Sequence, residues 1–205
     1  MSQPIKILAF AGSARIESFN KKLVKIAAEE AKVAGAEVTY LDLLDYPMPI
    51  FNEDLEAQEG LPDTVLQFKA LLRSHQGFLI SCPEYNGSIT PLLKNVIDWA
   101  SRPDPQEPSM ALSGFKGKVA ALLATSPGGL GGIRGLVHVR AILEGIGVLV
   151  IPDQKAIPGA YQAFDDQGNL KDEKQLKAVQ AIATKLVDVT AKLSVQHENC
   201  SSYSD

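Results

Sequence analysis

The stretch "IKILAFAGSARIESFN" at residues 5–20 joins a continuous apolar run to a short polar loop. The run "IKILAF" (5–10) has the length of a strand, and its lack of apolar–polar alternation is typical of a parallel sheet covered on both faces. After the loop, Leu23, Ile26 and Ala27 recur at helical spacing and share one face. The stretch therefore predicts a strand, a polar loop and a helix, in that order.

The same alternation recurs along the chain. Further apolar runs of strand length lie at 36–41, 77–81, 118–125 and 148–151. Amphipathic segments follow Pro62 and occupy 92–100, 135–147 and 173–193. Five successive βα units predict an α/β fold, a three-layer α/β/α sandwich around a five-stranded parallel sheet with the strand order 2-1-3-4-5.

A single domain is expected over residues 1–194. Residues 195–205 are polar and lack a periodic apolar face, so this tail is expected to be frayed. Residues 45–61 contain prolines and are expected to form a long loop that either lies over a ligand or links two elements.

Charge and composition exclude several classes of protein. The 205 residues carry 20 Lys and Arg against 24 Asp and Glu, a net charge of −4, and the cations are scattered, which argues against nucleic-acid binding. No apolar run approaches the roughly 20 residues of a membrane span. The N-terminus passes straight into the first strand, so we expect a cytoplasmic protein. Cys82 and Cys200 form neither a disulfide framework nor a zinc pattern, and no metal site is predicted.

Three unusual loops follow the first, third and fourth predicted strands, at residues 11–20, 82–91 and 126–134. In the order 2-1-3-4-5 these strands are neighbours, so the three loops meet at one edge of the sheet. Ligands of such sheets bind beyond the carboxyl ends of the strands, where the strand order reverses. The convergence of the loops therefore predicts a ligand site.

The first loop, "AGSARIESFN" (11–20), suits a phosphate group. Gly12 permits close approach of the backbone, Ser13, Ser18 and Asn20 offer donors, and Arg15 brings a positive charge. The alternative is a tight turn in which Ser18 caps the following helix. The loop lacks the spacing of a dinucleotide fingerprint, of a nucleoside-triphosphate loop and of a hydrolase elbow.

The other two loops suit a flat ring. In "CPEYNGSITP" (82–91), Pro83 fixes the chain and Tyr85 offers an aromatic face. In "SPGGLGGIR" (126–134), four glycines leave main-chain N–H groups accessible, although a flexible turn is the alternative.

Taken together, "GSARIESFN", "PEYNGSITPLLKNVIDWAS" and "SPGGLGG" followed by "RGLVHVRAILEGIG" resemble the NADPH-dependent FMN reductase family, a flavodoxin-like group that includes bacterial quinone, chromate and azo-dye reductases. The resemblance covers about residues 5–150. Family members often carry another residue where this chain has Pro127. The resemblance implies binding of the FMN phosphate by Ser13, Arg15, Ser18 and Asn20, of the isoalloxazine ring by Pro83, Glu84, Tyr85, Asn86 and Gly87, and of its other edge by Ser126, Gly128 and Gly129.

The activity implied by the resemblance is an NAD(P)H-dependent, FMN-containing reductase. Hydride would pass from NADPH or NADH to FMN, and electrons would then pass to a quinone, azo compound, metal oxyanion or similar small acceptor in a ping-pong reaction. No side chain is required as a catalytic residue, and a homodimer or homotetramer is implied. For the 2′-phosphate of NADPH the basic candidates are Arg15, Arg102, Arg134 and Arg140.

Two other functions stay open for this fold. One is a flavodoxin-type electron carrier, which Arg15 and the modest net charge disfavour. The other is a flavin-free sensor or scaffold. Among single residues, Cys82 is expected in the core, Trp99 in the core or at an interface, and His138 in packing or a subunit contact. His75 lies at a helix end, where a cation would suit the helix dipole.

Overall fold

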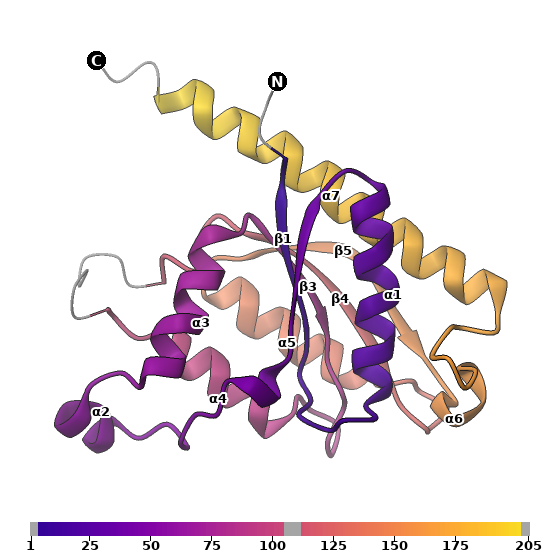
Figure 1. Cartoon of the computed structure of the whole chain (residues 1–205), viewed down its shortest axis with the longest axis horizontal. Helices are drawn as coiled ribbons and strands as arrows, with labels where there is room; N and C mark the ends of the chain where they lie inside the picture. The colour runs from indigo at the N-terminus through magenta and orange to yellow at the C-terminus, as the bar shows by residue number, and fades with distance from the viewer. Residues whose placement is uncertain (1–3, 105–111, 202–205) are drawn as a thin grey trace.

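The computed structural model of the chain describes residues 4–104 and 112–201, with side chains up to residue 194. Its five strands form one parallel sheet in the order β2-β1-β3-β4-β5, as the sequence predicts. Figure 1 shows the strands between α1 and α3. The strands are β1 (Lys6–Ala11), β2 (Glu37–Leu41), β3 (Gly77–Ser81), β4 (Val119–Thr125) and β5 (Leu149–Ile157).

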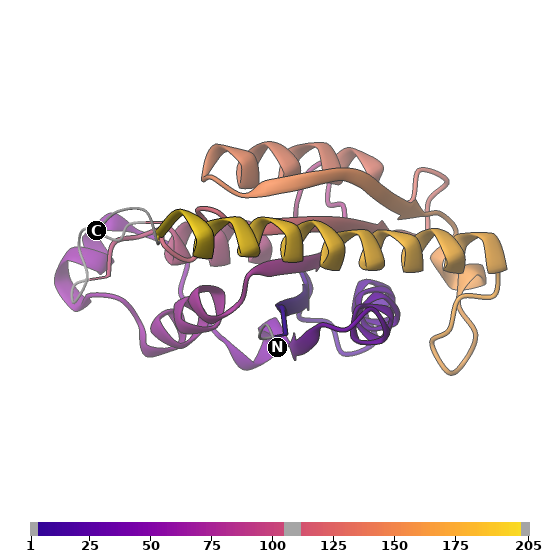
Figure 2. The same cartoon turned by 90° about the horizontal axis from the view of Figure 1, so that it is seen from above.

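Helices cover both faces of the sheet, which confirms the predicted sandwich. One face packs against α1 (Phe19–Val33) and α7 (Glu173–Ser201), and the other against α3 (Asp63–Ser74), α4 (Pro91–Ala100) and α5 (Ile133–Gly145). In Figure 2 the yellow helix α7 runs across most of the width of the molecule. The short elements are η1 (Leu43–Asp45), α2 (Glu53–Glu59) and α6 (Ala160–Ala163).

The central strands are apolar between their ends because each of these residues faces one of two cores. On β1, Leu8 and Phe10 pack into the core beneath α3, where the Phe10 ring meets Phe68 edge-on at 5.9 Å. Ile7 alternates with them and packs beneath α1, beside Leu23. Each such buried side chain contributes about 1.5–3 kcal/mol of transfer free energy. This double burial leaves the strand ends as the place for polar groups.

Strand β5 is longer than the predicted run at 148–151. Val150 pairs with Ala120, but the next partner of β4 is reached only at Gln154, so β5 carries a bulge between them. Pro152 lies in this bulge, where its missing N–H costs no ladder hydrogen bond. Because β5 is an edge strand with polar residues after the proline, its second half has no apolar signal.

The segment 45–61 is not an uninterrupted loop, because it contains α2. Asn52 caps this helix by accepting from Asp54 N at 2.8 Å. Before it, the Pro49 carbonyl accepts from Trp99 Nε1 at 2.8 Å and from Asn95 Nδ2 at 2.9 Å, which fixes the segment on α4. At the other end of the chain, α7 runs to Ser201, past the predicted end of the helix at 193. The predicted fraying of 195–205 stays a prediction, because its side chains and residues 202–205 lie outside the described part of the chain.

The burial of Cys82 and Trp99 is confirmed, but the prediction for His75 is wrong. His75 is buried, with Nδ1 at 2.7 Å from the Leu71 carbonyl and Nε2 at 2.8 Å from Thr39 Oγ1. A carbonyl only accepts and a hydroxyl can donate, so these partners suit a neutral ring with its proton on Nδ1. Burial lowers the pKa of His75, which disfavours the cation expected at the helix end.

The stability of the fold should therefore depend on pH through His75. The unfolded chain binds a proton near the ordinary histidine pKa of about 6.5, whereas the folded chain does so only at lower pH. The contribution of the neutral His75 ring to the free energy of unfolding is complete above about pH 6.5. It is lost as the pH falls below that value, by at most about 1.4 kcal/mol per pH unit. Urea unfolding between pH 7.5 and 5 should show a smaller loss for His75→Gln than for the parent.

His138→Gln is the matched control, because His138 is exposed on α5. The parent and the two variants contain the same carboxylates, so the contribution of these groups to the pH dependence of stability cancels in the comparison. Equal pH slopes for the parent and His75→Gln would contradict the assignment of His75 as a buried neutral group.

Candidate functional site at the carboxyl ends of the strands

A cleft lies where β1, β3 and β4 end, and all three predicted loops contribute to its lining. Its enclosed part has a volume of about 90 Å³, well below the roughly 300–1,000 Å³ of a complete ligand pocket. The cleft is therefore too small to enclose a whole ligand of ordinary size. The lining residues are Ser13, Arg15, Ser18, Phe19, Asn20, Pro83, Glu84, Tyr85, Thr125, Ser126, Pro127 and Tyr161.

The first loop presents donors that the described residues do not use. Ser18 occupies the N-cap position of α1, but its side chain makes no capping hydrogen bond. The N–H groups of Phe19 and Asn20, in the first helical turn, have no backbone partner in the described chain. Arg15 is exposed and forms no ion pair with any described residue. Unpaired N–H groups at a helix start beside a free cation form an anion site.

Asn20 has a structural task that the sequence does not reveal. Its Oδ1 accepts from Thr125 N at 3.1 Å and from Ser81 Oγ at 2.8 Å, while Nδ2 donates to the Thr125 carbonyl at 2.9 Å. The amide therefore ties α1 to the ends of β3 and β4, and only one amide proton is left for a ligand. Ser13, by contrast, only accepts from Arg15 N at 3.3 Å and keeps its own hydroxyl proton.

The second loop turns sharply at Asn86 and Gly87, whose φ angles are 52° and 79°. Tyr85 and Ser88 flank this turn and exchange two backbone hydrogen bonds of 3.0 Å. Two successive residues with positive φ are typical of a type I′ turn, which favours asparagine followed by glycine. Tyr85 is half exposed at the cleft, so its ring is accessible to a ligand. Asn86 and Gly87 form the tip of the turn and do not line the cleft.

Glu84 lines the cleft, but its carboxylate is already engaged. It accepts from Arg134 Nε at 2.7 Å, from Arg134 N at 3.0 Å and from Gly135 N at 3.3 Å. Desolvation opposes ionisation, but these hydrogen bonds and the charge of Arg134 together lower the pKa of Glu84. Glu84 thus connects the second loop to the start of α5.

The glycines of the third loop divide into two kinds. A Cβ on Gly131 would lie 2.7 Å from the carbonyl carbon of Ile157, so this position has no room for a side chain. Gly129 is open, since a Cβ there would meet nothing within 4 Å, and Gly128 is almost as open. The open pair leaves bare backbone directly after Ser126 and Pro127, which line the cleft, but Gly128 and Gly129 are not themselves among the lining residues. The packed glycine fixes the loop against β5.

Two residues outside the three predicted loops also line the cleft, and the sequence does not predict them. Tyr161 of α6 is 68% exposed, and its ring meets Phe19 edge-on at 5.4 Å. Thr125 ends β4 and donates from Oγ1 to the Ile157 carbonyl at 2.9 Å. The helix α6 has only four residues, too few for a periodic signal.

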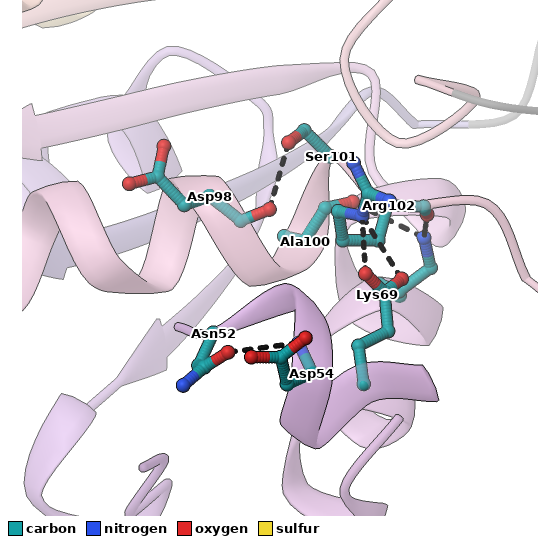
Figure 3. Close-up of polar contacts among 8 residues, drawn as sticks. Asn52, Asp54, Lys69, Asp98, Ala100, Ser101 and Arg102 are labelled. Carbon is teal, nitrogen blue, oxygen red and sulfur yellow. Dashed lines mark hydrogen bonds and ion pairs between the residues drawn. The ribbon is translucent and has the colours of Figure 1, made fainter. Parts of the chain in front are cut away.

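The four arginine candidates for a 2′-phosphate are not equivalent. Arg102 donates from Nε to both oxygens of Glu56 at 2.8 and 2.9 Å, in the cluster of Figure 3, where Lys69 donates to the Ala100 and Arg102 carbonyls. Arg140 donates to the Val150 and Ile151 carbonyls at 3.1 and 2.8 Å. Arg134 pairs with Glu84. Arg15 alone among the four has no partner in the described part of the chain.

A doubly wound sheet with a cleft at the carboxyl ends of its strands defines the class of α/β proteins whose ligands bind beyond the strand ends. The family model for NADPH-dependent FMN reductase matches residues 5–162, and the chain belongs to this family. As far as the described residues show, no helix has both the length and the apolar character to cross a membrane.

Relatives of this chain are named as reductases. It is 37% identical to an NAD(P)H-dependent FMN reductase of Pseudomonas aeruginosa, with 88% of this chain and 92% of the relative covered. It is 35% identical to an NAD(P)H:quinone oxidoreductase of Solanum tuberosum, covering 94% and 96%. Among solved structures, the flavoenzyme NAD(P)H:(acceptor) oxidoreductase FerB of Paracoccus denitrificans aligns with a TM-score of 0.77 at 31% identity, covering 92% of this chain and 98% of that one.

Replacing Asn20 should destabilise the fold. Asn20→Ala would leave Thr125 N, the Thr125 carbonyl and the Ser81 hydroxyl buried without their partner, at a cost of about 2–4 kcal/mol. Urea unfolding of the FMN-free protein measures this cost. Gln58→Ala, at an exposed side chain of α2 that makes no hydrogen bond with the described residues, is the control and should change the free energy of unfolding by about 0.5 kcal/mol or less. Equal effects of the two variants would refute the bracing role of Asn20.

Proposed function

We propose that this member of the FMN reductase family is a quinone-type oxidoreductase that binds the phosphate end of FMN in the cleft and uses NADPH or NADH as its reductant. The observation that carries the proposal is the set of unused donors at the start of α1 beside the unpaired Arg15. These groups suit a dianionic phosphate, and the 90 Å³ of enclosed volume suits that end of the cofactor.

The residues divide between those that would hold the phosphate and those that would lie against the ring. Ser13, Arg15 and Ser18 would hold the phosphate, with one amide proton of Asn20. The ring would lie at the rim, against the 83–87 loop and beside Ser126, Gly128 and Gly129, where the bare backbone lets it approach closely.

FMN, when bound, would supply the redox chemistry as a carrier of hydride from the nicotinamide to the acceptor, with the balancing proton taken from water. The chain supplies orientation and electrostatics, so no side chain acts as acid or base. The open rim would admit a nicotinamide and then a quinone at the same place, which supports a ping-pong order. Azo compounds and metal oxyanions are further candidate acceptors for the same exposed face.

The setting of the activity is part of the proposal. We place the enzyme in the cytoplasm as a homodimer or homotetramer, with no nucleic-acid partner. The other candidate functions, an electron carrier or a flavin-free sensor of the same fold, lack the nicotinamide reaction or the bound flavin. An absorption spectrum before and after addition of FMN and NADPH separates all three.

Arg15→Ala should weaken FMN binding by about ten- to a hundredfold, because it removes a charge-assisted contact to the phosphate. Fluorescence titration of the FMN-free protein measures the dissociation constant. Lys177→Ala is the control, since Lys177 is an exposed cation on α7 that pairs with Glu173. If Arg15→Ala bound FMN as tightly as the control, the placement of the phosphate would be wrong.

Steady-state kinetics should show the ping-pong order. With NADPH varied at several fixed concentrations of a small quinone, double-reciprocal plots should give parallel lines, because the oxidised nicotinamide leaves before the quinone binds. NADPH alone should bleach the absorption of the bound FMN. Intersecting lines would show that both substrates bind together. Retained FMN that NADPH does not bleach would instead indicate an electron carrier, which has no nicotinamide reaction.

A further inference from the structure

The side chain of Glu84, which belongs to the second loop, caps the N-terminal end of α5. The N-cap position of α5 is Gly132, whose φ is 92° and which has no side chain to accept from the first turn. The Glu84 carboxylate takes that place and accepts from the N–H groups of Arg134 and Gly135. Two otherwise orphaned donors are thereby paired across 50 residues of sequence.

The packing around this cap is close. A Cβ on Gly135 would lie 3.2 Å from the Ser88 carbonyl oxygen and 3.5 Å from Glu84 Cα, so the loop rests directly on the first turn of α5. His138, one turn further along, lies with Nδ1 at 2.8 Å from Ser88 Oγ. The second loop and the third loop, which ends at α5, are therefore held as one unit.

The cap also balances charge at the edge of the cleft. The side chain of Glu84 is only 8% exposed and lines the cleft, whereas that of Arg134 is 61% exposed. The carboxylate cancels two positive sources, the Arg134 guanidinium and the N-terminal end of the α5 dipole. The pair thus contributes little net charge to the cleft as long as both members are present.

We propose that Glu84 and Arg134 form a positioning pair that sets the reduction potential of the bound FMN. The inference rests on the proposed placement of FMN in the cleft. Reduction adds negative charge to the cofactor, so a net positive charge beside the cleft stabilises the reduced form and a net negative charge destabilises it. Removing either member of the pair should therefore shift the potential, and the two shifts should have opposite signs.

The test compares Glu84→Gln and Arg134→Gln holoenzymes by equilibrium reduction against a reference dye. In Glu84→Gln the ratio of the FMN dissociation constants, oxidised over reduced, should rise about tenfold, which raises the potential by about 30 mV. In Arg134→Gln the ratio should fall about threefold, a smaller change because water screens the exposed guanidinium. Glu173→Gln is the matched control, since it removes one negative charge from an exposed pair on α7.

Opposite shifts beyond that of the control would support the inference. Shifts of the same sign, or none beyond the control, would overturn it, because a loss of packing alone gives no reversal of sign. If Glu84→Gln does not fold, Arg134→Gln decides: a lower potential supports the pair, and an unchanged or higher one overturns it. If the parent chain retains no FMN, or if Arg15→Ala binds FMN with unchanged affinity, the proposed placement of FMN is overturned instead.

Discussion

Burial of both faces of a parallel sheet is the constraint on which the rest of this structure depends. Strands β1, β3 and β4 have no solvent-facing side, so the side chains between their ends are apolar and their backbone groups are paired within the sheet. Polar groups collect where the strands end and the loops begin. A cleft at the carboxyl ends is therefore a consequence of how the core is made.

Those loops are held by side chains that serve the fold and the cleft at once. Asn20 joins α1 to β3 and β4, Glu84 joins the second loop to α5, and Thr90 Oγ1 donates to the Gly12 carbonyl at 2.7 Å. Each bridge crosses between loops that are far apart in sequence. A site preorganised in this way binds its ligand with little loss of backbone freedom.

The sequence predicts the sheet order and the three converging loops, because continuous apolar runs and dense glycine are local signals. It does not predict the second half of β5, whose edge position removes the apolar pattern, and it errs on His75, where burial against Thr39 overrides the helix dipole. The partners of Asn20 and Glu84 are set by tertiary packing, since they lie 50 or more residues away. Sequence motifs thus locate the cleft but do not separate groups left for a ligand from groups already bonded within the chain.

The bulge in β5 affects how this edge of the sheet meets other protein molecules in a crowded solution. An edge strand offers unpaired N–H and C=O groups to any extended segment of another molecule, and a long regular edge invites sheet growth between molecules. Here Pro152 withholds one N–H, and the bulge changes the spacing of its neighbours. The charged Asp153, exposed beside them, would be forced against an incoming strand. Arg140 of α5 also occupies the Val150 and Ile151 carbonyls. This edge of the sheet is thereby protected against templated aggregation.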